Sequence, residues 1–168
     1  LFGTNELGQD VLSLVMAGTT VSVLAGFGVV LIGSVIGTLV GAVAGFVGGW
    51  TDEGLMRLTD LTLTIPSLIL AMAIAAALGP GFTNMVIAIS LSWWPGYARL
   101  VRGEVLAARE EVYVTAARAI GASPARILFR HILPNVVSPI IVKMSLDMGF
   151  AILTVARLGF IGIGGFFQ

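Results

Sequence analysis

Long runs of apolar residues, separated by polar or glycine- and proline-rich breaks, dominate the sequence. Charged residues are absent between Asp10 and Asp52, and again between Asp60 and Arg99. A helix needs about 20 apolar residues to cross a bilayer, and helices satisfy their own backbone hydrogen bonds over that length. The pattern therefore predicts membrane-spanning helices near residues 19–49, 61–78, 84–108 and 135–163.

The breaks between these runs predict how the spans are connected. We expect residues 1–18 to form an external interfacial segment, in which residues 10–16 are a short helix at the membrane surface. Residues 51–60 are expected to be a short polar loop. Pro66 either kinks the second span or marks its start, and residues 79–81, Gly-Pro-Gly, predict a turn that ends it.

Glycines recur every four residues through the first predicted span. They are Gly33, Gly37, Gly41, Gly45 and Gly49. This spacing places them on one face of a helix, where the missing side chains let another helix approach closely. The alternative is a loosely structured glycine-rich segment, but in so apolar a run the pattern favours a helix-packing face.

Residues 99–131 form the one strongly polar region. Its arginines are Arg99, Arg102, Arg109, Arg118, Arg126 and Arg130. The alanine-rich stretch 112–119, followed by Gly121 and then Ser123-Pro124, predicts a helix, its C-terminal glycine and the start of a second helix. We therefore expect two short helices outside the bilayer, in a loop at about residues 109–134.

The same arginines predict the orientation of the chain. Lys and Arg in short loops stay on the cytoplasmic side, which places the 109–134 loop inside. Alternation of the spans then puts residues 51–60 inside as well, and residues 79–83 and both ends of the sequence outside.

Composition supports a membrane protein and excludes several functions. Hydrophobic residues make up 57% of the chain, charged residues 11%, and the mean hydropathy is +1.03. These values leave too few charges to cover a soluble globule. The net charge is zero, so no general attraction to nucleic acid is expected. The sequence begins without an initiator Met or signal peptide, so we expect it to be an internal piece of a longer chain.

No residue pattern points to catalysis. The chain has no cysteine and a single histidine, His131, with no carboxylate nearby in sequence. No serine has a histidine or acid placed to activate it, and no G-x-x-x-x-G-K-[ST] phosphate loop occurs. The glycines at 159–165 lack a surrounding βαβ pattern. The sequence predicts no catalytic residue, no metal site and no cofactor.

Three ionisable residues fall within the last predicted span. Lys143 and Asp147 are four residues apart and so share a helical face, and Arg157 lies nearer the outer end. Ionisable groups at membrane depth face a cavity, a partner or each other. Two interpretations stay open for Lys143 and Asp147, a mutually neutralising pair or contacts along a substrate pathway. Arg157 is the more exposed candidate for lining such a route.

Residues 111–135 carry a motif that resembles the EAA loop of ABC importer permeases. That motif has two alanines in a helix of small residues, a glycine four positions later, and a Leu-Pro ending thirteen positions beyond the glycine. The matching residues are Ala116, Ala117, Gly121, Leu133 and Pro134. Residues 2–13, 97–103 and 158–164 resemble the peptide/nickel branch of the same family. Thr115 departs from the motif, since a glutamate usually stands there.

The resemblance implies an all-α polytopic transmembrane helix bundle, a partial permease domain at 19–168, with a cytoplasmic coupling loop. By resemblance, the partners are a homologous second permease subunit, two cytoplasmic ATP-binding subunits that hydrolyse ATP, and an external substrate-binding protein. The chain itself would be a transport subunit and not an enzyme. The expected location is a prokaryotic cytoplasmic (inner) membrane, crossed several times.

The resemblance also implies a coupling role for one set of residues and leaves the substrate open. The expected coupling residues are Thr115, Ala116, Ala117, Arg118, Gly121, Arg126, Leu133 and Pro134. Di- or oligopeptides are the expected substrates, with nickel or an oligosaccharide as alternatives. A structural membrane protein without transport activity and an intramembrane enzyme are the competing classes.

Overall fold

The computed structural model describes residues 3–5 and 8–161, and these form an all-α fold. The helices are α1 (Val11–Val47), α2 (Gly49–Thr64), α3 (Ser67–Leu78), α4 (Phe82–Ala108), α5 (Val112–Ala119), α6 (Pro124–Arg126) and α7 (Val137–Phe160). A π-helical turn (Ile127–Ile132) and a 3-10 turn (Leu133–Asn135) join α6 to α7. Within the described residues the β structure is an isolated bridge between Thr4 and Asp10. The predicted all-α class is confirmed.

Helix α1 passes without a break through the expected boundary at residues 18 and 19. Its 37 residues begin after Asp10, whose carboxylate accepts hydrogen bonds from the backbone N–H (3.2 Å) and hydroxyl (2.7 Å) of Ser13. These bonds hold the pKa of Asp10 below its ordinary value. No proline interrupts the helix, and it ends at Gly48, which has a φ of 71°. The separate short helix expected at 10–16 is therefore wrong. That residues 1–18 form an external interfacial segment stays a prediction.

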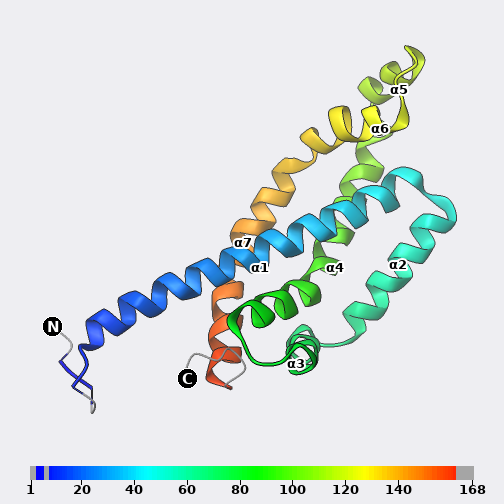
Figure 1. Ribbon diagram of the computed structural model, residues 1–168. Helices are drawn as coiled ribbons and strands as arrows, with labels where there is room; N and C mark the ends of the chain where they lie inside the picture. Colours follow the sequence, from blue (N-terminus) through cyan, green and yellow to red (C-terminus); the bar gives the residue numbers. More distant parts are fainter. Residues whose placement is uncertain (1–2, 6–7, 162–168) are drawn as a thin grey trace.

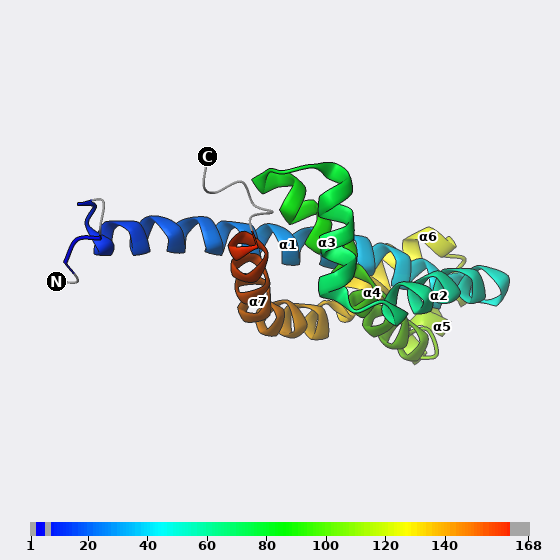
Figure 2. The same cartoon turned by 90° about the horizontal axis from the view of Figure 1, so that it is seen from below.

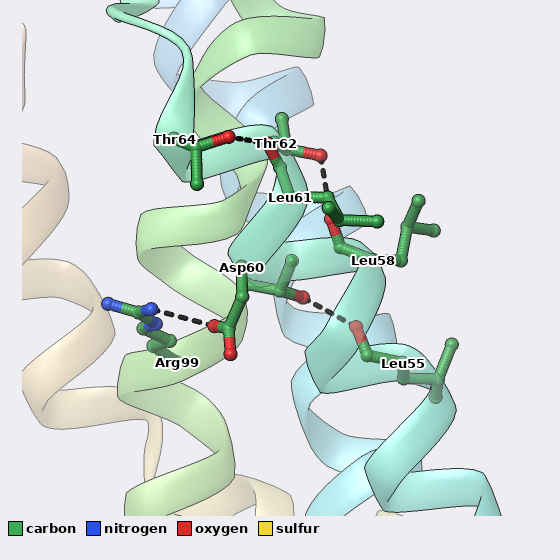
Figure 3. Close-up of polar contacts among 8 residues, drawn as sticks. Leu55, Leu58, Asp60, Leu61, Thr62, Thr64 and Arg99 are labelled. Atoms are coloured by element: carbon green, nitrogen blue, oxygen red, sulfur yellow. Dashed lines mark hydrogen bonds and ion pairs between the residues drawn. The ribbon is translucent and has the colours of Figure 1, made fainter.

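Residues 51–60, expected to be a polar loop, are part of helix α2, and this expectation was wrong. The turn between α1 and α2 needs only Gly48 and Gly49, both with positive φ, so the polar residues are free to form a helix. Threonine hydroxyls along α2 donate to carbonyls about one turn earlier, including Thr62 to Leu58 at 2.8 Å and Thr64 to Leu61 at 2.6 Å (Figure 3). These local bonds satisfy polar groups without unwinding the helix.

The second predicted span is not one straight helix. Ile65 and Pro66 separate α2 from α3, and the two helices are bent by 93°. Pro66 therefore marks the start of α3, because a proline cannot donate the backbone hydrogen bond that would continue α2. In the described residues, α1 and α7 are long and apolar enough to span a membrane, and α2 with α3 could form a third, broken span.

The remaining predicted span, 84–108, forms helix α4. Its C-terminal half is too polar for α4 to count as a membrane-spanning helix by composition alone. The expectation of four spans thus stays a prediction. α7 matches the expected start of the last span, and the expected end at residue 163 lies outside the described residues.

Helix α4 packs along α1, α3 packs against α4, and α7 contacts both α1 and α4 (Figures 1 and 2). One cluster of buried side chains joins α1, α3, α4 and α7 around Val29, Met85 and Ile89. A second cluster extends from Tyr97 and Val101 on α4 to Ile132, beneath α5 and α6. The two clusters place α4 at the centre of the fold, with α5 and α6 projecting at the end far from the N-terminus.

Candidate functional site

The glycine face of α1 lies directly against α4. A Cβ atom at Gly37 would overlap the Trp94 carbonyl and the Tyr97 Cβ, and one at Gly41 would overlap the Ala98 carbonyl. At Gly45 the added atom would come within 2.9 Å of the Arg102 carbonyl oxygen, whereas at Gly33 the nearest atom is 3.5 Å away. The backbones of α1 and α4 therefore approach most closely at Gly37 and Gly41. We call Gly33, Gly37, Gly41 and Gly45 the glycine stripe.

Gly49 does not share this contact. It lies beyond the end of α1 with a φ of 57°, and no described atom lies within 4 Å of a Cβ placed there. The helical face formed by the predicted glycines therefore ends at Gly45. The physical reason is Gly48, which ends α1 and changes the direction of the chain.

A hollow of about 390 Å³ opens between α3, α4 and α7. Lys143, Asp147 and Arg157, the ionisable residues of the last predicted span, all line it. Hydroxyl groups and an aromatic ring complete its polar lining, namely Ser67, Ser92, Thr154 and Trp93. The structure thus brings the three predicted pathway residues onto one polar surface, because their spacing places them on the same side of α7.

Lys143 and Asp147 form an ion pair beside Tyr97. The Lys143 Nζ lies 3.0 Å from the Asp147 Oδ2 and 3.3 Å from Oδ1. It also lies 4.9 Å from the centre of the Tyr97 ring, which is fully buried. The side chains of Lys143 and Asp147 are 31% and 16% exposed, so the pair is only partly shielded from solvent. The pair borders a second hollow, which also includes Leu100 and Leu146.

The predicted coupling loop, residues 109–134, is a helical segment that projects from the bundle (Figure 1). We call it the coupling segment. Helix α5 ends in the hydrogen-bond pattern typical of a C-terminal glycine. The Gly121 N–H donates to the Arg118 carbonyl and the Ala122 N–H to the Ala117 carbonyl, both at 3.0 Å. Gly121 has a φ of 78°. Ser123 then caps α6, accepting from the Arg126 N–H at 3.4 Å.

Exposure divides the predicted coupling residues into two groups. Ala117 is buried within the segment and Leu133 is half-buried, so both hold its helices together. The exposed members are Thr115, Ala116, Arg118, Gly121, Arg126 and Pro134. Sequence reasoning missed exposed apolar residues of the same segment, of which Val112 and Ile120 are the most exposed. The available signal was their position at the two ends of the predicted helix 112–119, on either side of the buried Val114 and Ala117.

Ion pairs between α2 and α4 were also missed. Arg102 forms a two-pronged pair with Asp52, with its Nη2 2.6 Å from the Asp52 Oδ2. Arg99 contacts Asp60 at 2.7 Å (Figure 3). Arg109 donates to the Gly45 carbonyl at 3.1 Å, near the end of α1. Three of the arginines that predicted the orientation therefore also bind within the chain. The reversed order of the two acid–arginine pairs could have suggested antiparallel helices.

The Asp52–Arg102 pair should stabilise the contact between α2 and α4. These side chains are 16% and 35% exposed. Asp52→Asn removes the charge, and we expect it to lower the unfolding free energy by about 1–2 kcal/mol, because a hydrogen-bonded charge loses its partner. Thermal unfolding of the purified subunit in detergent measures the change.

The Asp60–Arg99 pair is the matched control, because each of its side chains is 56% exposed. Asp60→Asn is expected to cost less than about 1 kcal/mol, as is usual for exposed ion pairs. Equal effects of the two substitutions would contradict the stabilising role given to Asp52.

Residues 33–168 match the family described as "Binding-protein-dependent transport system inner membrane component". The chain belongs to this family. It is 49% identical over 163 residues to a protein of Escherichia coli (strain K12) named as a probable D,D-dipeptide transport system permease protein. It is 43% identical over 162 residues to a glutathione transport system permease protein of Pectobacterium atrosepticum, and 44% identical over 163 residues to that of Escherichia coli O157:H7.

These similarities cover 96–97% of the chain but 54–55% of each relative, so the chain spans about half the length of the curated relatives it matches. The segment matched to the inner membrane component family contains the glycine stripe from Gly33 on, the polar hollow and the whole coupling segment. Its family and its apolar helices place the chain in a membrane. In the part of the chain that the structure describes, no cluster of three metal-ligating side chains occurs.

Proposed function

We propose that this chain is part of the membrane-spanning permease subunit of an ATP-driven importer of di- or oligopeptides. The observation that carries the proposal is the position of two features at separate places on one helical framework. A polar hollow lined by Lys143, Asp147 and Arg157 lies between α3, α4 and α7, and a projecting helical segment begins where α4 ends. The first suits contact with a polar substrate and the second suits contact with a driving partner.

The geometry supports a mechanical link between these features. The buried cluster around Tyr97, Val101 and Val105 continues to Val114 and Ile132 of the coupling segment. Side chains packed in this way transmit displacement as a rigid body. Movement of α5 and α6 by an ATPase would therefore move α4 and α7, which line the hollow.

Partners follow from the exposed surface of the coupling segment and from the family. Val112 and Ile120 offer apolar contact, and Arg118 and Arg126 offer charge-assisted hydrogen bonds to acidic groups of a cytoplasmic ATP-binding subunit. Two such ATPases, a homologous second permease subunit and an external substrate-binding protein would complete the importer. In this arrangement ATP hydrolysis belongs to the partner subunits.

The proposed location is a prokaryotic inner membrane, crossed several times, with the coupling segment on the cytoplasmic side. Exposed arginines of that segment, Arg118, Arg126 and Arg130, support the orientation, since basic residues remain inside. The apolar surfaces of α1 and α7 would face lipid or other helices of the complete transporter.

Peptides are favoured as substrates by the relatives, whose names concern D,D-dipeptide and glutathione transport. The hollow adds physical support, since it presents a carboxylate, an ammonium and a guanidinium to a ligand that carries both charges. The charged lining of the hollow therefore supports a peptide as the substrate.

Reconstituted transport tests the proposal. The full-length subunit is assembled in vesicles with its second permease subunit, the ATPases and the substrate-binding protein. We expect ATP-dependent uptake of radiolabelled dipeptide, and no uptake when the ATPases are inactivated. An intact, ATP-hydrolysing complex that takes up no di-, tri- or tetrapeptide would show that the proposed substrate class is wrong.

A further inference from the structure

The ammonium group of Lys143 occupies a site built from two other side chains. The carboxylate of Asp147 contacts it at 3.0 Å, and it lies over the Tyr97 ring, 4.9 Å from the ring centre. A carboxylate and an aromatic face both bind ammonium groups in proteins, through charge-assisted hydrogen bonding and cation–π attraction. We call these two groups, Tyr97 and Asp147, the ammonium seat.

The ammonium seat is next to space that a small ligand could occupy. Lys143 and Asp147 both border the hollow of about 390 Å³ between α3, α4 and α7, and the neighbouring one of about 610 Å³. Sites for small ligands commonly measure about 300–1,000 Å³. Gly96 lies beside the lysine, and a Cβ atom placed on it would be 3.6 Å from the Lys143 Cε. A ligand in either hollow could therefore reach the seat if the lysine moved.

Tyr97 supplies an independent observation. Its hydroxyl is buried and makes no hydrogen bond of ordinary geometry to any described residue, although Asp147 is its charged neighbour. A buried tyrosine hydroxyl normally has a hydrogen-bond partner. The seat therefore places a tyrosine hydroxyl beside its carboxylate, and this hydroxyl can hydrogen-bond a group that enters between them.

Lys143 is suited to leave the seat. Its side chain is 31% exposed, its aliphatic stem is flexible, and the hollows give it room to move. Arg157 lines the same hollow and forms no ion pair with a described residue. A zwitterion would thus find a carboxylate for its ammonium group and a free guanidinium for its carboxylate.

We propose that Lys143 is a tethered occupant of a binding seat for the α-ammonium group of the transported peptide. When substrate enters, its ammonium replaces that of Lys143 between Tyr97 and Asp147. When substrate leaves, the lysine returns and neutralises Asp147. The seat thus binds the free amino terminus of the substrate, and the lysine occupies the seat between transport events. This inference rests on the proposed peptide transport.

A purely structural ion pair is the competing explanation. Residues four apart on a helix commonly form such pairs, and the pair would then simply neutralise two charges on α7. The two explanations differ in what removal of the lysine does. If the pair is only structural, removing the lysine makes the protein less stable and does not improve ligand binding. If the lysine occupies a binding site, its removal leaves that site vacant for the ligand.

The test measures equilibrium binding of radiolabelled dialanine to the full-length permease–ATPase complex in nanodiscs, without the substrate-binding protein. The key variant is Lys143→Met, which keeps an unbranched apolar side chain over the Tyr97 ring. If the lysine fills the seat about 90% of the time, its removal should tighten dialanine binding about tenfold. N-acetyl-dialanine, which has the carboxylate but no ammonium group, should not compete.

Two further variants keep the result interpretable. Lys143→Met combined with Asp147→Asn should lose the tighter binding, because the seat no longer has its carboxylate. Lys143→Gln repeats the test with a polar side chain if the methionine variant does not assemble, as judged by subunit stoichiometry and melting temperature. If neither single variant assembles, the pair is structural and the proposal is overturned.

Other outcomes also overturn the proposal. In the first, Lys143→Met binds dialanine undetectably or no more tightly than the wild type does. In the second, N-acetyl-dialanine competes as well as dialanine. Wild-type uptake in vesicles separates this failure from that of the proposed function. Normal dipeptide uptake with a negative binding result leaves the transport function intact and removes only the ammonium seat.

Discussion

Replacing Gly121 by valine is expected to lower coupled uptake by roughly tenfold while the subunit still inserts in the membrane. Gly121 has a φ of 78°, a region that costs a residue with a side chain about 1–2 kcal/mol, and about 1.4 kcal/mol corresponds to a tenfold change in an equilibrium. A branched side chain there should displace the two hydrogen bonds that end α5. The ATPase would then meet a coupling segment of altered shape. ATPase activity and dipeptide uptake, measured together in reconstituted vesicles, report the loss.

Gly121→Asn is the matched control, because asparagine adopts the left-handed conformation more readily than other residues with side chains. No described atom lies within 4 Å of a Cβ at Gly121, so backbone conformation and not lack of space decides the result. The asparagine variant should keep most of the uptake. Normal uptake by the valine variant, with the ATPase fully bound, would mean that coupling takes place elsewhere.

Gly41→Leu is expected to prevent stable folding of the subunit. The first atom of any side chain at Gly41 overlaps the Ala98 carbonyl, and Val101 and Arg102 close the rest of the space. Overpacking a side chain commonly costs about 1–3 kcal/mol and sometimes more, against a total stability of about 5–15 kcal/mol. Here backbone atoms of α4 form the obstacle, so side-chain rearrangement cannot relieve it. The yield of monodisperse protein and its melting temperature measure the effect.

Gly103→Leu provides the control on the partner helix. Gly103 lies within α4, and no described atom comes within 4 Å of a Cβ built there. A leucine at that position should leave the melting temperature nearly unchanged or raise it slightly, because leucine favours helices more than glycine does. Similar losses from both substitutions would indicate a general intolerance of leucine and would contradict the proposed contact.

The glycine stripe shows how far periodicity alone can reach. A four-residue spacing in an apolar run was enough to predict a face for close helix contact. It could not identify the partner, which is α4 of the same chain, and it extended the face one glycine too far. The limit arose because Gly48 ends the helix through its backbone conformation, which spacing does not reveal.

Helix α2 shows the opposite error. Polarity at 51–60 suggested a loop, because a break between apolar runs usually connects spans. The segment is helical because the turn needs only Gly48 and Gly49, and it is held on α4 by Asp52 and Asp60, which pair with Arg102 and Arg99 some forty to fifty residues later in the chain. Such pairing depends on how distant segments meet, so the polarity of residues 51–60 alone does not reveal it.

For this protein, the sequence by itself determined the apolar helices, the glycine–proline breaks and the form of the coupling segment. These depend on local properties, namely hydropathy over one helix length, the backbone freedom of glycine at Gly121 and the capping residue Ser123. Only the tertiary structure decided that α4 is the central helix, that α2 and α3 are bent apart, and that Lys143 lies on Tyr97 beside Asp147. The central position of α4 and the contact of Lys143 with Tyr97 require residues far apart in the chain to meet, and Pro66 alone allowed either a kink or a helix start, so its outcome also depended on the folded arrangement.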